Sequence, residues 1–192
     1  MTLPPPAVLA DLPDYPEWYP GQDDIVSAIL SWVTDPDDVR FLAIPAPTGS
    51  GKTLLAILTG VLSKMRTTYL SHTKGLQDQY IARHERNGLR DIRGQNNYIC
   101  KINNTVTVAD GPCHDGLKCL VKETECPYFL KLARVQQALG VVTNYAYWLL
   151  AQNQLGDIGL LVCDEAHEAF GALEGWASVT IKYDDYDDRL PE

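Results

Sequence analysis

Two polar stretches of this chain carry residue types that together can hold and cleave a nucleoside triphosphate. Residues 46–53 read Ala-Pro-Thr-Gly-Ser-Gly-Lys-Thr, the pattern of a phosphate-binding loop except that Ala46 replaces its first glycine. Glycine lets backbone N–H groups approach an anion, the lysine supplies a charge for the terminal phosphates, and the threonine hydroxyl can ligate Mg²⁺. We therefore expect the following residues to hold Mg-ATP: Thr48, Gly49, Ser50, Gly51, Lys52 and Thr53.

The second stretch is Asp164-Glu165-Ala166-His167. In phosphoryl transfer, one carboxylate can hold the Mg²⁺ that bridges the terminal phosphates, while another group positions or deprotonates the attacking water. We assign the first role to Asp164 and the second to Glu165, and we expect His167 to link the nucleotide state to the rest of the molecule. An upstream phosphate loop favours this catalytic interpretation over an ordinary acidic helix cap.

The elements that must position these stretches follow from short apolar and β-branched runs. The predicted strands are residues 41–44, 67–71, 141–143 and 160–163. Ligands of an open α/β sheet bind at the carboxyl ends of its parallel strands, so we expect the loop and the acidic stretch to meet there. The fold class is α/β, a RecA-like P-loop NTPase domain with a parallel sheet. The continuous apolar run at 160–163 predicts a strand buried on both faces, with Cys163 as a small buried residue.

Helical spacing of apolar residues, or a polar run behind a strand, predicts the remaining elements. The predicted helices are residues 22–33, 54–64, 128–139 and 144–150, and residues 72–80 predict a strand end that turns into a polar helix. Gln22 begins the first of these, where its amide could read an adenine edge, although a lone glutamine is more often a solvated surface residue. Residues 1–20 are rich in proline and predict an extended lead-in, while 177–181 indicate one more strand and 183–188 a solvated acidic segment.

The composition of the chain limits the classes of partner that it can be expected to bind. The chain lacks the ~18 uninterrupted apolar residues of a membrane span and a recognisable signal peptide, so we expect no membrane partner and a cytoplasmic location. The net charge of −9 argues against nucleic acid, yet residues 64–134 carry 12 basic and 7 acidic side chains. A basic segment between acidic flanks is expected if one face of the protein binds a polyanion. An ordinary solvated surface of mixed charge explains the same distribution equally well.

Four cysteines fall in the middle of the chain, at Cys100, Cys113, Cys119 and Cys126. Disulfides are disfavoured in a cytosolic protein, and zinc sites usually use close C-x₂₋₄-C pairs, which these four do not form. Thiolates alone can supply all ligands of an iron–sulfur cluster, so their spacing favours a cluster over zinc while leaving both open.

Taken together, these motifs resemble the N-terminal motor lobe of superfamily 2 iron–sulfur DNA helicases of the XPD/DinG type. The resemblance rests on these segments, in the family's order: 19–22 (the adenine-reading motif), 46–53 (motif I), 72–79 (motif Ia), 93–100 and 126–129 (the cluster-domain borders), 142–145, and 164–167 in its DEAH form (motif II).

The resemblance implies a division of the chain and a set of partners. The implied segments are the motor lobe at 21–93 and 131–183, a cysteine-rich insert at 94–130 whose four cysteines bind a [4Fe-4S] cluster, and an acidic tail or linker at 184–192. The implied activity is ATP-driven unwinding of duplex DNA with 5′ to 3′ movement on single-stranded or forked DNA. The candidate strand contacts are Thr73, Lys74, Asn144 and Tyr145, with Arg90 and Arg93 as weaker ones.

The family also uses a second motor lobe that supplies an arginine, and the sequence reaches Glu192 without it. Because such an arginine is worth ~10³–10⁵ in rate, we expect these residues alone to be a feeble ATPase. The second lobe would then come from the same protein or from another chain, and a eukaryotic family member would be nuclear. The alternative is a non-catalytic module that binds ATP or a cluster and docks on DNA or protein.

Overall fold

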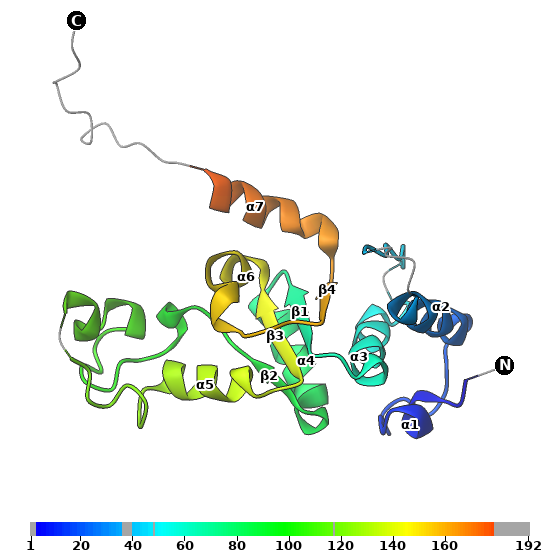
Figure 1. The fold of residues 1–192 in the computed structure, drawn as a ribbon, viewed down its shortest axis with the longest axis horizontal. Coiled ribbons are helices and arrows are strands. Elements are labelled where there is room, and N and C mark those ends of the chain that lie inside the picture. Colours follow the sequence, from blue (N-terminus) through cyan, green and yellow to red (C-terminus); the bar gives the residue numbers. More distant parts are fainter. Residues whose placement is uncertain (1–2, 36–39, 48, 117, 179–192) are drawn as a thin grey trace, which may run out of the picture.

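The computed structural model describes residues 3–35, 40–47, 49–116 and 118–178, which contain a four-stranded sheet of order β2-β3-β1-β4 (Figure 1). The strands are β1 (Thr67–Ser71), β2 (Leu89–Asp91), β3 (Gly140–Asn144) and β4 (Leu160–Cys163). All neighbouring pairs are parallel, and Tyr69 of β1 faces Val142 of β3 on one side and Val162 of β4 on the other. This confirms the predicted α/β class with a parallel sheet.

Seven α-helices lie within the described residues. They are α1 (Pro6–Leu9), α2 (Gln22–Thr34), α3 (Lys52–Ser63), α4 (Lys74–His84), α5 (Pro127–Gln136), α6 (Tyr145–Ala151) and α7 (Ala169–Ala177). Five of them coincide with predicted helices to within a few residues. The periodic apolar positions that predicted α2 lie inside the protein, since Val26 and Ile29 are buried.

Alternation along the strands gives the sheet two buried faces. Tyr69 and Val142, which are register partners, enter a core built with residues of α2, α3 and α4. The preceding residue of β3, Val141, belongs to a second core that contains residues of α5 and α6. Helices therefore cover both faces of the sheet, as a parallel sheet requires.

The predicted strand at 41–44 is wrong. This segment has no regular structure, and its apolar side chains are open to solvent, with Phe41 87% exposed. β4 consequently lies at the edge of the described sheet, where Leu161 is 41% exposed and Cys163 is also exposed. The prediction that β4 is buried on both faces is therefore wrong as well, because an apolar run shows that burial is favourable without showing which segment provides the cover.

The N-terminal segment is more ordered than its proline content predicts. It contains the single-turn helix α1, and Leu12 is fully buried in the first core. The Trp18 indole Nε1 donates to the carbonyls of Leu3 and Pro4 at 3.1 and 3.0 Å, which closes the segment on itself. The expectation of an extended lead-in is therefore wrong for this part of residues 1–20.

Two further segments either differ from the sequence-based expectation or lie outside the described residues. β2 has no counterpart among the predicted strands, because its three residues are too short to give a periodic signal. Of the predicted strand at 177–181, Ala177 ends α7, while 179–181 and the acidic segment 183–188 lie outside the described residues. Residues 94–130 are loop-rich, with short 3₁₀ turns and one antiparallel bridge between Ile99 and Thr107.

Candidate nucleotide and nucleic-acid site

The phosphate loop adopts a conformation that requires its glycines. Gly49 and Gly51 have φ angles of 83° and 82°, in the left-handed region that glycine adopts without strain. Gly51 precedes the first turn of α3, and a Cβ atom placed on it would lie 2.3 Å from Nε2 of Gln22. At Gly49, by contrast, no atom lies within 4 Å of a Cβ position, so this part of the loop is open to the close approach that a phosphate group needs.

Gln22, at the start of α2, supports the phosphate loop through hydrogen bonds. Its side-chain Nε2 donates to the carbonyl of Ser50 at 2.8 Å, and its Oε1 accepts from the backbone N–H of Tyr19 at 3.0 Å. Gln22 is only 3% exposed, so the amide is part of the loop's support rather than a solvated surface group. Each end of the amide retains one further hydrogen-bonding position.

The donor groups of the loop fit a phosphate. The hydroxyl oxygen Oγ of Ser50 is buried and has no hydrogen-bond partner among the described residues, so it leaves a polar group to be satisfied. The loop opens into the N-terminus of the 12-residue helix α3, where unpaired N–H groups and the helix dipole favour an anion. Thr48, which was predicted to belong to this cradle, lies outside the described residues.

Lys52 and Glu165 meet directly. The Lys52 Nζ atom lies 2.6 Å from Oε1 of Glu165, and the two side chains are 27% and 32% exposed. The hydrogen bond from Lys52 lowers the pKa of the Glu165 carboxyl group below its ordinary value. Glu165 also has φ 50°, a left-handed conformation that costs a non-glycine residue about 1–2 kcal/mol. The sharp turn after β4 thus aims the acidic stretch at the phosphate loop.

Asp164 is held by two tyrosines. The Tyr80 hydroxyl donates to Oδ2 of Asp164 at 2.9 Å, and the Tyr145 hydroxyl donates to the backbone carbonyl of Asp164 at 2.9 Å. The Thr53 hydroxyl lies beside the Tyr80 phenol as a second polar neighbour. Thr53 and Asp164, the two protein ligands predicted for magnesium, are therefore both neighbours of Tyr80.

This pair of oxygen ligands fits Mg²⁺. Magnesium prefers oxygen ligands and is usually held by one or two carboxylates together with water and substrate phosphates rather than by a full protein cage. Within the described part of the chain no three His, Cys, Asp or Glu side chains form a group able to hold a metal ion alone. A site built from Thr53, Asp164 and the phosphates of a nucleotide meets the preference of magnesium without such a group.

Comparison with protein families identifies the domain. Residues 19–181 match the model of the DEAD/DEAH box helicase family. The chain belongs to this family. A search of curated proteins gives no match. The family match implies a RecA-like α/β fold, the use of ATP and Mg²⁺, and ATP hydrolysis dependent on nucleic acid. Of the described helices, none is both long and hydrophobic enough to traverse a lipid bilayer.

His167 of this helicase domain lies at the surface beside the acidic stretch. Its side chain is 71% exposed, with Nδ1 3.5 Å from Oε2 of Glu165 and Nε2 3.5 Å from Oε1 of Glu168. His167 therefore approaches one oxygen of the Glu165 carboxylate while Lys52 contacts the other. This position suits the expected link to the rest of the helicase.

Three of the four predicted nucleic-acid contacts lie where the strands end. Thr73 and Asn144 cap the helices that follow β1 and β3, accepting from the N–H groups of Leu76 at 3.2 Å and Tyr147 at 2.8 Å. Lys74 is exposed in the first turn of α4. Tyr145 is instead 6% exposed, and its hydroxyl is bonded to Asp164, so it does not present its side chain to a nucleic acid.

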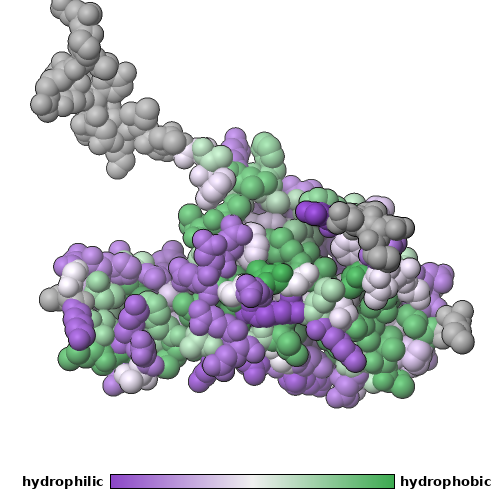
Figure 2. Space-filling model, viewed as in Figure 1, coloured by the Kyte–Doolittle hydropathy of each residue, from purple (hydrophilic) through white to green (hydrophobic). Residues whose placement is uncertain are grey.

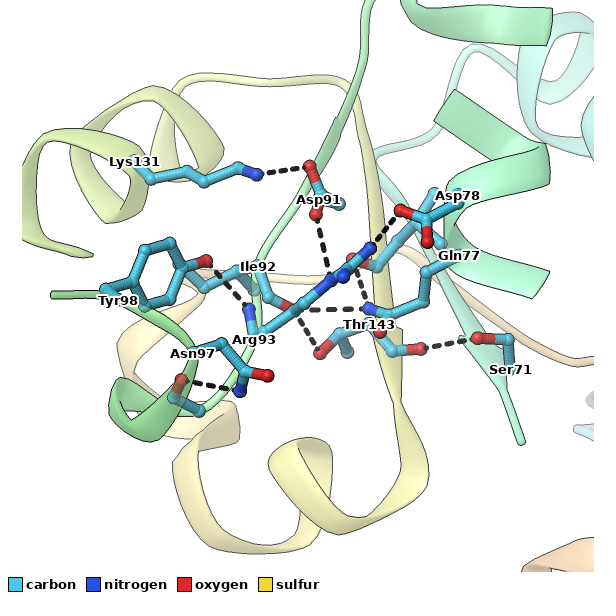
Figure 3. A network of polar contacts seen from close by, with 12 residues as sticks. Ser71, Gln77, Asp78, Asp91, Ile92, Arg93, Asn97, Tyr98, Lys131 and Thr143 are labelled. Atoms are coloured by element: carbon cyan, nitrogen blue, oxygen red, sulfur yellow. Dashed lines mark hydrogen bonds and ion pairs between the residues drawn. The ribbon is translucent and has the colours of Figure 1, made fainter. Parts of the chain in front are cut away.

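The two weaker candidates, Arg90 and Arg93, serve the fold of the helicase domain. Arg90 donates to the carbonyls of Glu85 at 3.0 Å and Leu89 at 2.7 Å. Arg93 pairs with Asp78 and lies 3.5 Å from Asp91, which in turn binds Lys131 at 2.7 Å (Figure 3). These charges largely neutralise one another, so the basic segment is less available to a polyanion than its composition predicts.

A buried hydrogen-bond network fastens α4 to the sheet (Figure 3). Nε2 of Gln77, which is fully buried, donates to the carbonyls of Ile92 at 3.3 Å and Val142 at 3.5 Å. Thr143 donates to the same Ile92 carbonyl at 2.9 Å, and the Ser71 hydroxyl donates to the Thr143 carbonyl at 3.5 Å. The surface that carries Thr73 and Lys74 is therefore anchored to β3 and to the residue that follows β2.

The four cysteines of the insert remain free thiols. Cys100 and Cys126 are buried, whereas Cys113 and Cys119 are partly exposed. Within the described residues these cysteines do not form a group of three metal ligands, so the structure does not show a cluster site. No step of the chemistry below is derived from one.

Sequence reasoning did not identify Tyr80 as part of the site. Its only local signal is a large aromatic side chain six residues into an otherwise polar helix, and such a residue ordinarily predicts core packing. Its partner, Asp164, is 84 residues away in the sequence. Only the three-dimensional arrangement shows that the phenol ends at the acidic stretch.

Proposed function

We propose that this domain is the first motor lobe of an ATP-dependent DNA helicase, binding Mg-ATP at the phosphate loop and single-stranded DNA at the carboxyl ends of β1 and β3. The observation that carries the proposal is the meeting of the two predicted stretches, with Nζ of Lys52 2.6 Å from Oε1 of Glu165. A lysine and a carboxylate at this separation can share one triphosphate between them.

The residues of the phosphate loop and of the acidic stretch have different roles in hydrolysis. The loop N–H groups and Lys52 bind the terminal phosphates, while Thr53 and Asp164 hold Mg²⁺, which when bound neutralises charge on those phosphates. Binding of the triphosphate requires Lys52 to exchange the Glu165 carboxylate for a phosphate oxygen. Glu165 is then free to orient or deprotonate the attacking water, a role that contributes ~10²–10⁴ to the rate.

The finer assignment rests on the resemblance to iron–sulfur helicases of the XPD/DinG type. We infer 5′ to 3′ movement and a preference for single-stranded or forked DNA from it. We infer also that a second motor lobe, in the same protein or in another chain, supplies the arginine that stabilises the transferred phosphoryl group. The cysteine insert stays a predicted cluster domain, tested by iron and sulfide analysis of anaerobically purified protein. Zinc without sulfide would contradict it.

Nucleotide binding by the chain tests the central claim. Lys52→Ala should weaken binding of a fluorescent ATP analogue about tenfold or more, because a hydrogen bond to a charged group is worth about 1.5–3 kcal/mol. The matched control is Lys118→Ala, an exposed lysine in the cysteine insert, which should bind as the unmodified chain does. Equal affinity in all three proteins would contradict the proposal.

Turnover separates catalysis from binding alone. In single-turnover measurements, the unmodified chain with single-stranded DNA should hydrolyse bound ATP faster than without DNA. Nucleotide binding that requires Lys52 but is never followed by hydrolysis, even when a second lobe is supplied, would favour the non-catalytic binding module instead.

A further inference from the structure

Tyr80 lies where three parts of the nucleotide site meet. It lies in α4, is 1% exposed, and donates its hydroxyl proton to Oδ2 of Asp164 at 2.9 Å. The Thr53 hydroxyl at the start of α3 lies beside the same phenol. A residue of α4, the first turn of α3 and the carboxyl end of β4 therefore meet at a single side chain.

The chemistry of this contact is suited to fixing a metal ligand. The Tyr80 hydroxyl donates to Oδ2 of Asp164 at 2.9 Å, and an ionised carboxylate can only accept, which fixes the direction of this hydrogen bond. The hydrogen bond occupies Oδ2 of Asp164, and among the described residues Oδ1 has no hydrogen-bond partner. A rigid ring that holds one oxygen of a carboxylate leaves the other oriented toward a cation.

The same helix carries the nucleic-acid surface at its other end. α4 begins at Lys74, with Thr73 as its side-chain cap, and Tyr80 lies six residues further on. At a rise of about 1.5 Å per residue, the two functions are separated by roughly 9 Å of continuous helix. Gln77, between them, is bonded to Ile92 and Val142, and Tyr80 packs on Tyr69 with ring centres 5.8 Å apart. A helix supported in this way moves as one body.

We propose that Tyr80 is a positioning residue that couples DNA bound at the start of α4 to the magnesium end of the nucleotide site. The inference rests on the proposed function, and it adds the path by which the DNA contacts and the nucleotide site influence each other. A shift of α4 on binding DNA changes where the phenol holds Asp164, so DNA and Mg-nucleotide strengthen each other's binding. Because such coupling is reciprocal, both ligands must show the same factor.

Equilibrium binding of a fluorescent, non-hydrolysable ATP analogue tests the coupling. Each protein is titrated with the analogue in EDTA and at increasing Mg²⁺, with and without a single-stranded DNA oligonucleotide. In the unmodified chain the oligonucleotide should tighten binding about fivefold or more when Mg²⁺ is present. The reverse titration, oligonucleotide binding followed by anisotropy with and without Mg-analogue, should give an equal factor.

The variant Tyr80→Phe removes only the hydroxyl group. It should raise the half-saturating Mg²⁺ concentration about tenfold or more, the loss of one hydrogen bond to a charged group. It should also abolish the oligonucleotide effect and leave binding in EDTA unchanged. The control Tyr147→Phe loses a buried hydroxyl, bonded to Tyr128 at 3.0 Å in the second core, and should keep both the Mg²⁺ dependence and the coupling.

The outcomes are distinct. A Tyr80→Phe protein whose Mg²⁺ dependence and coupling equal those of the unmodified chain would show that Tyr80 only packs. If the unmodified protein binds the Mg-nucleotide with the same affinity in the presence and absence of the oligonucleotide, the inference is overturned, even if the variant does not fold. Unmodified protein that binds no nucleotide would overturn the proposed function itself.

Discussion

The centre of the sheet and its β4 edge differ in how their functional residues are supported. Around α4, β1 and β3, here called the α4 region, the strand residues are almost all buried, and the Gln77 network links α4 to β3. Around β4, α7 and residues 40–47 and 49–51, here called the β4 region, apolar side chains reach the surface (Figure 2), as at Phe170, which is 71% exposed. The α4 region carries the proposed DNA contacts, and the β4 region carries the hydrolytic residues.

This difference indicates a division between a closely packed region, in which Tyr80 is assigned a role at the nucleotide site, and a more exposed region that carries the acidic stretch. At the other buried positions of the α4 region a substitution should act mainly on folding, because packing and hydrogen bonds hold these residues. In the β4 region a substitution should act mainly on chemistry, because its ion pair is partly exposed and contributes little to stability. Three experiments test this comparison.

The largest effect is expected at Glu165. Glu165→Gln should lower ATP turnover about 10²–10⁴-fold by removing the group that activates water. It should change the free energy of unfolding by less than about 1 kcal/mol, since partly exposed ion pairs contribute little. Single-turnover hydrolysis and urea denaturation measure the two quantities. The control Glu168→Gln removes a neighbouring carboxylate that contacts His72 and His167 and should keep normal turnover.

An intermediate effect distinguishes two leucines in adjacent strands. Leu70 of β1 is 2% exposed, whereas Leu161 of β4 is 41% exposed. Leu70→Ala should lower the free energy of unfolding by about 2–5 kcal/mol, the usual loss for a buried leucine. Leu161→Ala should cost about 1 kcal/mol or less, as expected for a partly exposed site. Similar losses in urea denaturation would contradict the comparison.

The smallest effect is a dependence of stability on pH in the α4 region. His84 is 1% exposed and its ring stacks on Tyr15 with centres 6.1 Å apart, and burial lowers its pKa below the ordinary 6.5. As pH falls below 6.5, the unfolded chain binds a proton that the folded chain does not. The free energy of unfolding should therefore decrease on acidification, by at most about 1.4 kcal/mol per pH unit for one group.

Urea denaturation at pH 7.5 and 5.5 measures this difference. His84→Phe keeps an aromatic ring against Tyr15 and should reduce the loss on acidification, while His114→Gln, at an exposed histidine of the insert, should leave it unchanged. An unaltered pH dependence in His84→Phe would assign the effect to other groups.

Local sequence was sufficient where one segment determines its own structure. The bounds of β1 and β4 agree with the predicted strands, and Gly51 and Lys52 lie at the start of a helix as their motif requires. Glu165 reaches Lys52 because parallel strands end at one edge of the sheet, a rule that needs no side-chain detail.

Sequence was insufficient where burial depends on a distant segment. The apolar residues at 41–44 have the composition of a strand, but their pairing partner is not specified by that composition. Leu12 is buried by residues far along the chain, and Tyr80 acquires a polar partner from β4. Long-range contacts of this kind leave no periodic pattern.

The closeness of Gly51 to Gln22 makes the beginning of α2 part of the wall of the phosphate loop. Because a Cβ atom at residue 51 would lie 2.3 Å from Nε2 of Gln22, the space beside this glycine is already occupied by the amide. The same amide bonds to Ser50 in the loop and to Tyr19 in the N-terminal segment. The shape of the loop and the position of the N-terminal segment therefore depend on one side chain.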